Sequence, residues 1–395
     1  SVPGGARVIM CGILAFFTPE PDRVIERDMV VNATNLMTHR GPDDFGVHLD
    51  RHIGLGHRRL SIIDLASGQQ PVFNEDNSIA LVYNGEIYNY QETRQLLIAK
   101  GHLFKSNCDT EVIVHAYEEW GTDCLQRFNG MFAFALWDKT KQLLWVARDR
   151  LGVKPLYYFS NGKEFACASE IKPLFSVGLV KAEMNERALD SYFSLGYVPA
   201  PETMFRGIRK LKPGHFLLVQ AGQLKEVEYW DFARIEPVAM DYEEATGKLQ
   251  LLLKDCVDKC LMSDVPLGVF LSGGLDSSAV VAMMSELGVE PVNSFTVGFD
   301  GRRSEGEERY AQIIARQFRT RHHVFTLAPD DFYPSISKLV QHCEEPIVEP
   351  AAIALNRLSE LARQNVKVLL SGEGSDEVLA GYFLYQFMQR LDQVQ

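Results

Sequence analysis

Short apolar runs of strand length dominate the first two hundred residues. They are rich in β-branched and aromatic side chains, which favour strands. Six such runs cover residues 10–17, 53–63, 79–83, 131–137, 142–147 and 164–168. The polar segment 138–141 and the Asn161-Gly162 pair are typical of hairpin turns between neighbouring runs. This pattern predicts antiparallel sheets.

Two segments between these runs have helical spacing instead. Residues 24–38 place apolar side chains on one face and end before Gly41-Pro42. Residues 110–120 do the same, with Asp109 placed to cap the helix and Gly121 placed to end it. We therefore expect an α+β domain in which helices pack on antiparallel sheets.

From about residue 241 the pattern changes to strands that alternate with helices. The predicted strands cover 265–271, 292–297, 323–327 and 366–370; the predicted helices cover 276–287, 304–318, 353–364 and the residues from 375 onward. Ser304 and Glu307 form a capping box for the second of these helices. Such alternation predicts an α/β doubly wound parallel sheet. We expect a first domain over 11–220, a linker over 221–240 and a second domain over 241–395.

Composition narrows the class of protein. The 395 residues are 46% hydrophobic and 23% charged, as in ordinary globular proteins. No apolar run reaches the roughly 18 residues needed to span a bilayer, and we expect no membrane association. The net charge of −12 argues against a nucleic-acid partner, because acidic surfaces repel phosphates.

Seven cysteines are too few and too scattered to form a disulfide framework, which indicates a reducing, cytoplasmic location. Cys256 and Cys260 share a helix spacing, but no second pair follows at zinc spacing. We interpret them as two small apolar residues.

The strongest local signal is a loop that follows the strand 265–271 and opens a helix. Its residues are Leu271, Ser272, Gly273, Gly274, Leu275, Asp276 and Ser277. The glycines allow close approach of a ligand, and the helix N-terminus directs N–H groups at an anion. The loop is not a Walker motif, because no Gly-Lys-Ser/Thr follows. Asp276 would repel bare phosphates, and so we interpret it as a ligand of a bridging Mg²⁺.

A second loop has the same character. Ser371, Gly372, Glu373, Gly374, Ser375 and Asp376 follow the strand 366–370 and open the last predicted helix. In a doubly wound sheet, both loops lie at carboxyl ends of strands, where ligands bind. Asp276 and Asp376 are then placed to hold metal on either side of one triphosphate. The alternative is that each loop is a tight turn whose Ser and Asp only cap a helix.

These two loops resemble those of the pyrophosphate-loop ATP pyrophosphatases, and the second narrows the resemblance to the asparagine synthetases. The resemblance implies that Ser272–Ser278 bind pyrophosphate and that Leu271, Val297, Ser371 and Gly372 contact adenosine. It implies Glu373 as an acid or base near the adenylate, and Asp276 and Asp376 as Mg²⁺ ligands.

The amino-terminal segment supplies a candidate nucleophile. Met10-Cys11-Gly12 resembles the start of a class II glutamine amidotransferase, an N-terminal-nucleophile hydrolase. Removal of Met10 would leave Cys11 first, and its free amine, with a pKa of about 7.7–8, can serve as base for its own thiol. A lone Cys is otherwise most often a core residue.

Three further segments make this resemblance specific. It implies that Asn84 and Gly85 form an oxyanion hole, that Arg59 and Ile63 bind the glutamine carboxylate end, and that Asp109, with Glu86, binds the α-amino group. The stretch 148–158 is also similar to the family, and we interpret it as a structural hairpin and interface.

Together the resemblances cover residues 10 to about 382 and imply a glutamine-hydrolysing asparagine synthetase, with glutamine, aspartate and MgATP as substrates. They also imply an internal passage for ammonia and a possible homodimer. Two readings stay open: a paralogue that amidates another carboxylate, such as a sugar acid, peptide or natural-product intermediate, and a catalytically silent relative that binds glutamine or nucleotide. Residues 1–9 would block the amine of Cys11 unless removed, and we expect family members to continue beyond Gln395.

Overall fold

The computed structural model describes residues 10–299, 307–346, 349 and 351–392. The chain divides into two compact units. The first comprises Ser1–Ala239 and Ser337–Pro350, and the second comprises Met240–Ile336 and Ala351–Gln395. No helix in the described ranges is long and apolar enough to cross a membrane.

The first unit contains two six-stranded sheets in which all neighbouring strands are antiparallel. The first sheet has the order β10 (Arg209–Lys210), β8 (Tyr157–Ser160), β9 (Phe165–Ala168), β1 (Gly12–Phe17), β3 (Ile53–Arg59) and β2 (Asp44–Asp50). The second has the order β12 (Gln223–Glu228), β11 (His215–Gln220), β7 (Leu143–Arg148), β6 (Gly130–Asp138), β5 (Ile79–Ile87) and β4 (Val72–Phe73).

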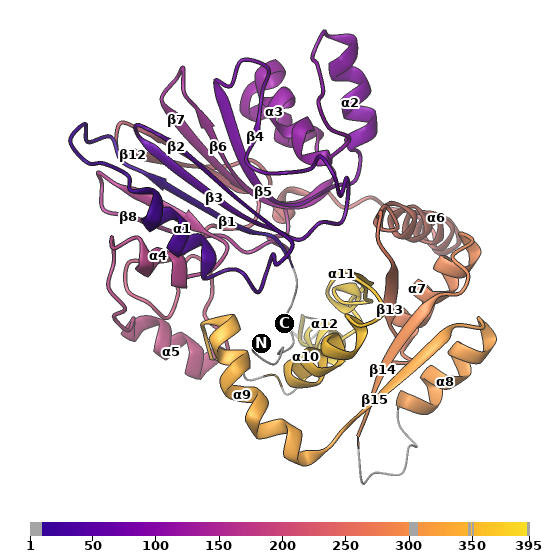
Figure 1. Ribbon diagram of the computed structural model, residues 1–395. Coiled ribbons are helices and arrows are strands. Elements are labelled where there is room, and N and C mark those ends of the chain that lie inside the picture. Colours follow the sequence, from indigo (N-terminus) through magenta and orange to yellow (C-terminus); the bar gives the residue numbers. More distant parts are fainter. Residues whose placement is uncertain (1–9, 300–306, 347–348, 350, 393–395) are drawn as a thin grey trace. The chain divides into compact units, whose positions relative to one another are not determined.

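Alternation along the strands builds four layers. On β1, Ile13, Ala15 and Phe17 face a core shared by the two sheets, whereas Leu14 and Phe16 face the helices α1 (Arg27–Asn35) and α4 (Lys172–Ser176). The outer face of the second sheet packs against α3 (Asp109–Trp120), and α2 (Tyr90–Ala99) lies beside α3 (Figure 1). The layers are therefore αββα, and the expected α+β domain with helices packed on antiparallel sheets is confirmed.

The first unit is completed by α5 (Glu186–Leu195), by two 3₁₀ helices over Gly121–Arg127 and Phe232–Arg234, and by a segment that returns from α9 (Pro329–Cys343). Glu344 anchors this segment, because its carboxylate accepts hydrogen bonds from the backbone N–H groups of Ile171 (2.5 Å) and Lys172 (2.7 Å).

The second unit is built on a four-stranded parallel sheet with the order β15 (Arg321–Leu327), β14 (Asn293–Phe299), β13 (Leu267–Phe270) and β16 (Val368–Leu370). Its helices are α6 (Tyr242–Cys260), α7 (Leu275–Glu286), α8 (Glu307–Gln317), α10 (Ala351–Ala362), α11 (Ser375–Leu379) and α12 (Phe383–Asp392).

Helices cover both faces of this sheet. Val269 of β13 packs in a cluster with α6, α7 and α8, whereas the next residue, Phe270, packs in a cluster with α10. Successive side chains of a strand point to opposite faces. The expected α/β doubly wound parallel sheet is therefore confirmed.

Several predicted boundaries differ from the structure. The strand predicted over 79–83 continues to Ile87, and the strand predicted over 53–63 ends at Arg59. Residues 223–228, expected in the linker, form β12, the edge strand of the second sheet. The sequence pattern did not reveal α2. Ser304 of the predicted capping box lies outside the described residues.

The aromatic core of the second sheet leads to a stability prediction. Phe134 is fully buried, and its ring centroid lies 4.8 Å from that of Trp145 in an edge-to-face contact. We expect Phe134→Ala to lower the free energy of unfolding of the first unit by about 3–5 kcal/mol, because it leaves a cavity. Urea unfolding followed by tryptophan fluorescence measures this change. The control is Phe193→Ala, at a side chain that is 79% exposed; equal effects of the two variants would contradict the prediction.

Candidate functional site

The candidate nucleophile lies at the entry to the first sheet. Cys11 immediately precedes β1, whose first residue, Gly12, pairs with Arg58 of β3. The backbone N–H of Leu60 contacts the thiol, with an N–Sγ distance of 3.3 Å. Nε of Arg40 donates to the carbonyl of Cys11 at 3.1 Å. The pairing of β1 with β3 thus fixes the half-buried thiol.

Buried positive charge lies around this thiol. Burial raises the pKa of Cys11, while the hydrogen bond from Leu60 and the charges of Lys154, Arg40 and Arg59 act in the opposite direction. Lys154 is itself buried, and its Nζ lies 3.2 Å from Sδ of Met10. Burial lowers the pKa of Lys154. We expected the segment containing Lys154 to be structural only; the structure places this residue in the electrostatic environment of Cys11.

The expected oxyanion-hole residues lie inside β5 and not after it. Asn84 pairs with Ala133, and Gly85 pairs with Phe132. Asn84 is buried, and its Nδ2 has no hydrogen-bond partner among the described residues. A buried donor without a partner is rare and calls for a ligand or water. This geometry fits a donor that stabilises developing negative charge.

His57 joins the two sheets near this point. Its Nε2 lies 3.1 Å from the backbone carbonyl of Tyr83, so that the contact runs from β3 to β5. Burial lowers the pKa of His57 to about 3, and the ring is therefore neutral near neutral pH. A neutral ring can hold a carbonyl only with its proton on Nε2. The sequence pattern gave no sign of this contact.

Asp109 does not cap α3, contrary to the expectation from sequence. The N-cap residue is Cys108, without a side-chain capping bond, and Asp109 is the first helical residue. Its Oδ2 instead accepts hydrogen bonds from the Tyr83 hydroxyl (2.8 Å) and the Ile87 N–H (2.9 Å). Oδ2 is thus bound to β5, while Oδ1 accepts from the thiol of Cys108 at 3.3 Å.

Asp109 is buried and Glu86 is half-buried, and the charges of their carboxyl groups influence each other. Burial raises the pKa of Asp109. Burial and the charge of Asp109 raise the pKa of Glu86 to about 7, and Lys154 opposes this shift. A cationic group bound near both would favour their charged forms. The pair therefore fits the expected contact with an α-amino group.

Arg59 holds the loop that follows β3. Its Nη2 donates to the carbonyls of Ile63 (3.1 Å) and Asp64 (2.6 Å). A side chain at Gly68 would place its Cβ 2.2 Å from this nitrogen and 2.9 Å from the carbonyl oxygen of Asp64, so that a larger residue there would displace the Arg59 side chain. Asp64 in turn accepts a hydrogen bond from the N–H of Asn107 at 2.8 Å. The structure thus ties the Arg59 segment to the segment that leads into Asp109.

The second unit contains the two glycine loops. Gly273 has a φ of +85°, and Gly274 is the N-cap residue of α7. The hydroxyls of Ser272 and Ser277 lie 3.0 Å apart, and Oγ of Ser272 accepts from the N–H of Gly274 at 3.2 Å. These bonds set the loop after β13 in a fixed turn at a helix N-terminus, where an anion is stabilised.

The two loops touch each other. A Cβ added to Gly372 would lie 2.9 Å from Cβ of Asp276 and 3.0 Å from the backbone nitrogen of Ser277. The contact arises because β13 and β16 are parallel neighbours, so that their carboxyl ends meet at one edge. Asp276 and Asp376 are each half-buried and lie in the first turns of α7 and α11. Their carboxylate oxygens are the ligands that Mg²⁺ prefers.

The remaining expected nucleotide contacts lie on the same edge. Leu271 is buried and donates its N–H to the carbonyl of Phe295 at 2.8 Å. Val297 is half-buried on the neighbouring strand β14. Ser371 and Glu373 are exposed in the loop between β16 and α11.

Comparisons with known proteins agree with this arrangement. A family model described as a glutamine amidotransferase domain matches residues 10–230, and one described as asparagine synthase matches residues 248–395. Glutamine-hydrolysing asparagine synthetase 1 of Bacillus subtilis is 35% identical over 380 residues, which cover 95% of this chain and 60% of that protein. The chain therefore spans less than two thirds of the length of this relative.

Two other relatives widen the comparison. A Methanocaldococcus jannaschii protein assigned provisionally as a second glutamine-hydrolysing asparagine synthetase is 36% identical over 407 residues, which cover 97% of this chain and 78% of that protein. Amidase chyE of Penicillium rubens is 34% identical over 404 residues, which cover 94% of this chain and 59% of that protein.

The charge of Lys154 leads to a prediction about the reactivity of Cys11. We expect Lys154→Met to raise the pKa of the thiol, and each unit of increase lowers the thiolate fraction about tenfold. Alkylation of Cys11 by iodoacetamide at neutral pH, measured by peptide mass spectrometry, should slow accordingly. The matched control is Lys139→Met, at a surface lysine 3.5 Å from Asp50. An unchanged rate in Lys154→Met would contradict the role given to this charge.

Proposed function

Because the chain belongs to the family of glutamine-hydrolysing asparagine synthetases, we propose that it releases ammonia from glutamine and uses it to amidate aspartate activated by ATP. The products are asparagine, glutamate, AMP and pyrophosphate. The observation that carries the proposal is the presence, on one chain, of a fixed half-buried thiol in the first unit and two touching glycine loops in the second.

In the first unit, Cys11 is the nucleophile. Once the preceding residues are removed, its own α-amine takes the thiol proton, and Sγ attacks the side-chain amide carbon of glutamine. Asn84 and Gly85 donate to the resulting oxyanion. Ammonia leaves with that proton, and water then hydrolyses the thioester to glutamate.

The same unit binds the other end of glutamine. Arg59, the last residue of β3, binds the α-carboxylate, for which a planar guanidinium is suited, and Ile63 contributes from the loop that follows. Glu86 and Asp109 bind the α-ammonium group. Their burial strengthens this contact, because charges attract more strongly away from water.

In the second unit, the loop from Ser272 to Ser277 holds the pyrophosphate part of ATP. Leu271, Val297, Ser371 and Gly372 contact adenosine. The aspartate side-chain carboxylate attacks the α-phosphorus and pyrophosphate leaves; ammonia then attacks the acyl carbon and AMP leaves, with Glu373 as acid or base. Asp276 and Asp376 would hold Mg²⁺, which neutralises the charge of the triphosphate.

A second candidate function is amidation of a different carboxylate by the same chemistry. Its support is the similarity to a protein named as an amidase. Screening carboxylic acids for pyrophosphate release separates the two candidates. If pyrophosphate is released with another carboxylic acid but not with aspartate, that acid is the acceptor and the proposed mechanism stands.

The proposal predicts that the two half-reactions are separable. We expect Cys11→Ala to abolish glutamine hydrolysis and glutamine-dependent amide formation, since no other group replaces the thiol, and to retain synthesis from added ammonium. Amide and pyrophosphate are measured with each nitrogen source. Cys256→Ala, at an exposed cysteine, serves as the control and should change neither. Loss of both activities in a folded Cys11→Ala protein would argue against two sites.

The raised pKa of Glu86 predicts a pH dependence. With a pKa of about 7, this carboxyl is charged above that pH and neutral below it, where it no longer attracts an ammonium group. We expect kcat/KM for glutamine to fall as the pH drops below about 7 and to level off above it, since kcat/KM reports the free enzyme.

The variant Glu86→Gln identifies the source of this pH dependence. In this variant, kcat/KM for glutamine should no longer fall as the pH drops below about 7. Its value should be about 10- to 100-fold lower, through loss of a charge-assisted hydrogen bond. Ammonium-dependent synthesis in the same variant is the control and should keep its profile. If the variant still shows the fall in kcat/KM below pH 7, another group causes it.

A further inference from the structure

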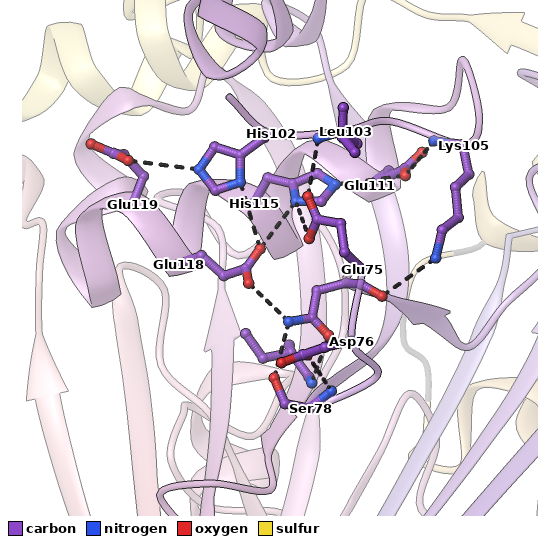
Figure 2. Close-up of polar contacts among 12 residues, drawn as sticks. Glu75, Asp76, Ser78, His102, Leu103, Lys105, Glu111, His115, Glu118 and Glu119 are labelled. Carbon is purple, nitrogen blue, oxygen red and sulfur yellow. Dashed lines mark hydrogen bonds and ion pairs between the residues drawn. The ribbon is translucent and has the colours of Figure 1, made fainter. Parts of the chain in front are cut away.

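Four side chains with nitrogen and oxygen ligands converge at one point of the first unit, apart from the residues assigned to glutamine. Glu75 lies in the turn between β4 and β5, His102 in the connection between α2 and α3, and His115 and Glu118 on α3. Figure 2 shows these side chains directed toward one another. One ligand atom from each lies within 4.8 Å of the corresponding atoms of the other three.

The distances are close to those of a tetrahedral ion. Nδ1 of His115 lies 3.0 Å from Oε2 of Glu118 and 3.7 Å from Oε2 of Glu75. Nδ1 of His102 lies 3.7 Å from the same oxygen of Glu118. Tetrahedral zinc with bonds of about 2.0–2.1 Å places its ligand atoms roughly 3.3 Å apart. These three separations bracket this value, and no two of the four ligand atoms lie more than 4.8 Å apart.

The second oxygen of each carboxylate is held by the protein. Oε1 of Glu75 accepts a hydrogen bond from the N–H of Leu103 at 3.0 Å. Oε1 of Glu118 accepts from Nδ2 of Asn74 at 2.8 Å. These bonds leave the Oε2 atoms directed at the two imidazoles and limit rotation of the carboxylates.

The second nitrogen of each imidazole faces another carboxylate. Nε2 of His115 lies 3.6 Å from Oε1 of Glu111, and Nε2 of His102 lies 3.6 Å from Oε2 of Glu119. A carboxylate behind the imidazole is the usual outer partner of a metal-bound histidine, since it fixes the tautomer and increases basicity. This arrangement occurs here twice, and it is independent of the convergence of the four inner atoms.

The charge of the cluster also favours a cation. Four carboxylates surround the two imidazoles, and Lys100 pairs with Glu119 at 2.6 Å. His115 has only 1% of its side chain exposed, so that the charges near it are poorly screened by water. A divalent ion bound by Glu75 and Glu118 would offset their negative charge.

We propose that Glu75, His102, His115 and Glu118 bind one divalent transition-metal ion, preferentially zinc. Two imidazole nitrogens and two carboxylate oxygens suit zinc, whereas Mg²⁺ and Ca²⁺ favour oxygen ligands alone. Four protein ligands make the site structural. It joins the β4–β5 turn and the α2–α3 connection to α3, and it is independent of the proposed function.

Metal titration of the full chain tests this proposal. Chelator-treated protein is titrated with zinc by calorimetry and with Co²⁺ by visible absorption. We expect one saturable equivalent of zinc and the intense bands of tetrahedral Co²⁺, without the charge-transfer band that a thiolate ligand gives. Binding that does not saturate, or a thiolate band at that equivalent, would overturn the assignment.

Variants identify the ligands. The double variant His102→Ala, Glu118→Gln should abolish the tight binding of one equivalent of zinc. Both side chains are partly exposed, at 15% and 24%, so that the fold should persist. Circular dichroism checks that it does. Glu119→Gln removes the charge of the outer partner of His102, which also pairs with Lys100, and should weaken zinc binding about 10- to 100-fold.

The matched controls are His215→Gln, at a histidine 3.8 Å from Glu228 on another element, and Cys11→Ala. Both variants should still bind one equivalent of zinc tightly. If the His102→Ala, Glu118→Gln variant also binds this equivalent, the cluster is an ion-pair network without metal.

Discussion

The need to compensate buried charge governs the architecture of the first unit. Lys154, Arg59 and Asp109 are all buried, and Glu86 is half-buried. A buried charge is tolerated only when it is paired or hydrogen bonded. Asp109 accepts hydrogen bonds from the Tyr83 hydroxyl and the Ile87 N–H, and Arg59 donates hydrogen bonds to two loop carbonyls. These charges can still attract the opposite charges of a zwitterionic ligand. The same residues are therefore costly to bury in the fold and suited to bind the proposed substrate glutamine.

The sequence predicted this site as separate motifs, and the structure shows where local signals were overridden. The strand predicted over 79–83 ends before Asn84 and Gly85, yet both residues continue the ladder between β5 and β6. Asp109 stands where a helix cap is expected, but its carboxylate binds β5. Both differences have one cause, since pairing with a segment distant in sequence contributes more than the local preference. No pattern in the sequence revealed Lys154 or His57, whose positions depend on contacts between separate strands.

The second unit was more predictable, because the alternation of strands and helices restricts the topology strongly. The same alternation located both glycine loops at strand ends. It did not reveal that Gly372 lies against Asp276, because that contact requires β13 and β16 to be neighbours although they are far apart in sequence. The motifs thus name the residues of the proposed nucleotide site, and the strand order brings the two loops together.

The helix α3 carries residues of both the proposed glutamine site and the proposed metal site of the first unit. Every residue from Asp109 to Tyr117 is buried, so that this helix cannot shift without disturbing the core on the second sheet. Its first turn carries the carboxylate that binds β5, and later turns carry His115 and Glu118. An ion bound at those later turns would fix the helix against the β4–β5 turn and the α2–α3 connection. It would thereby restrict the motion of Asp109 without contacting the proposed glutamine site, since a rigid helix transmits a constraint along its own axis.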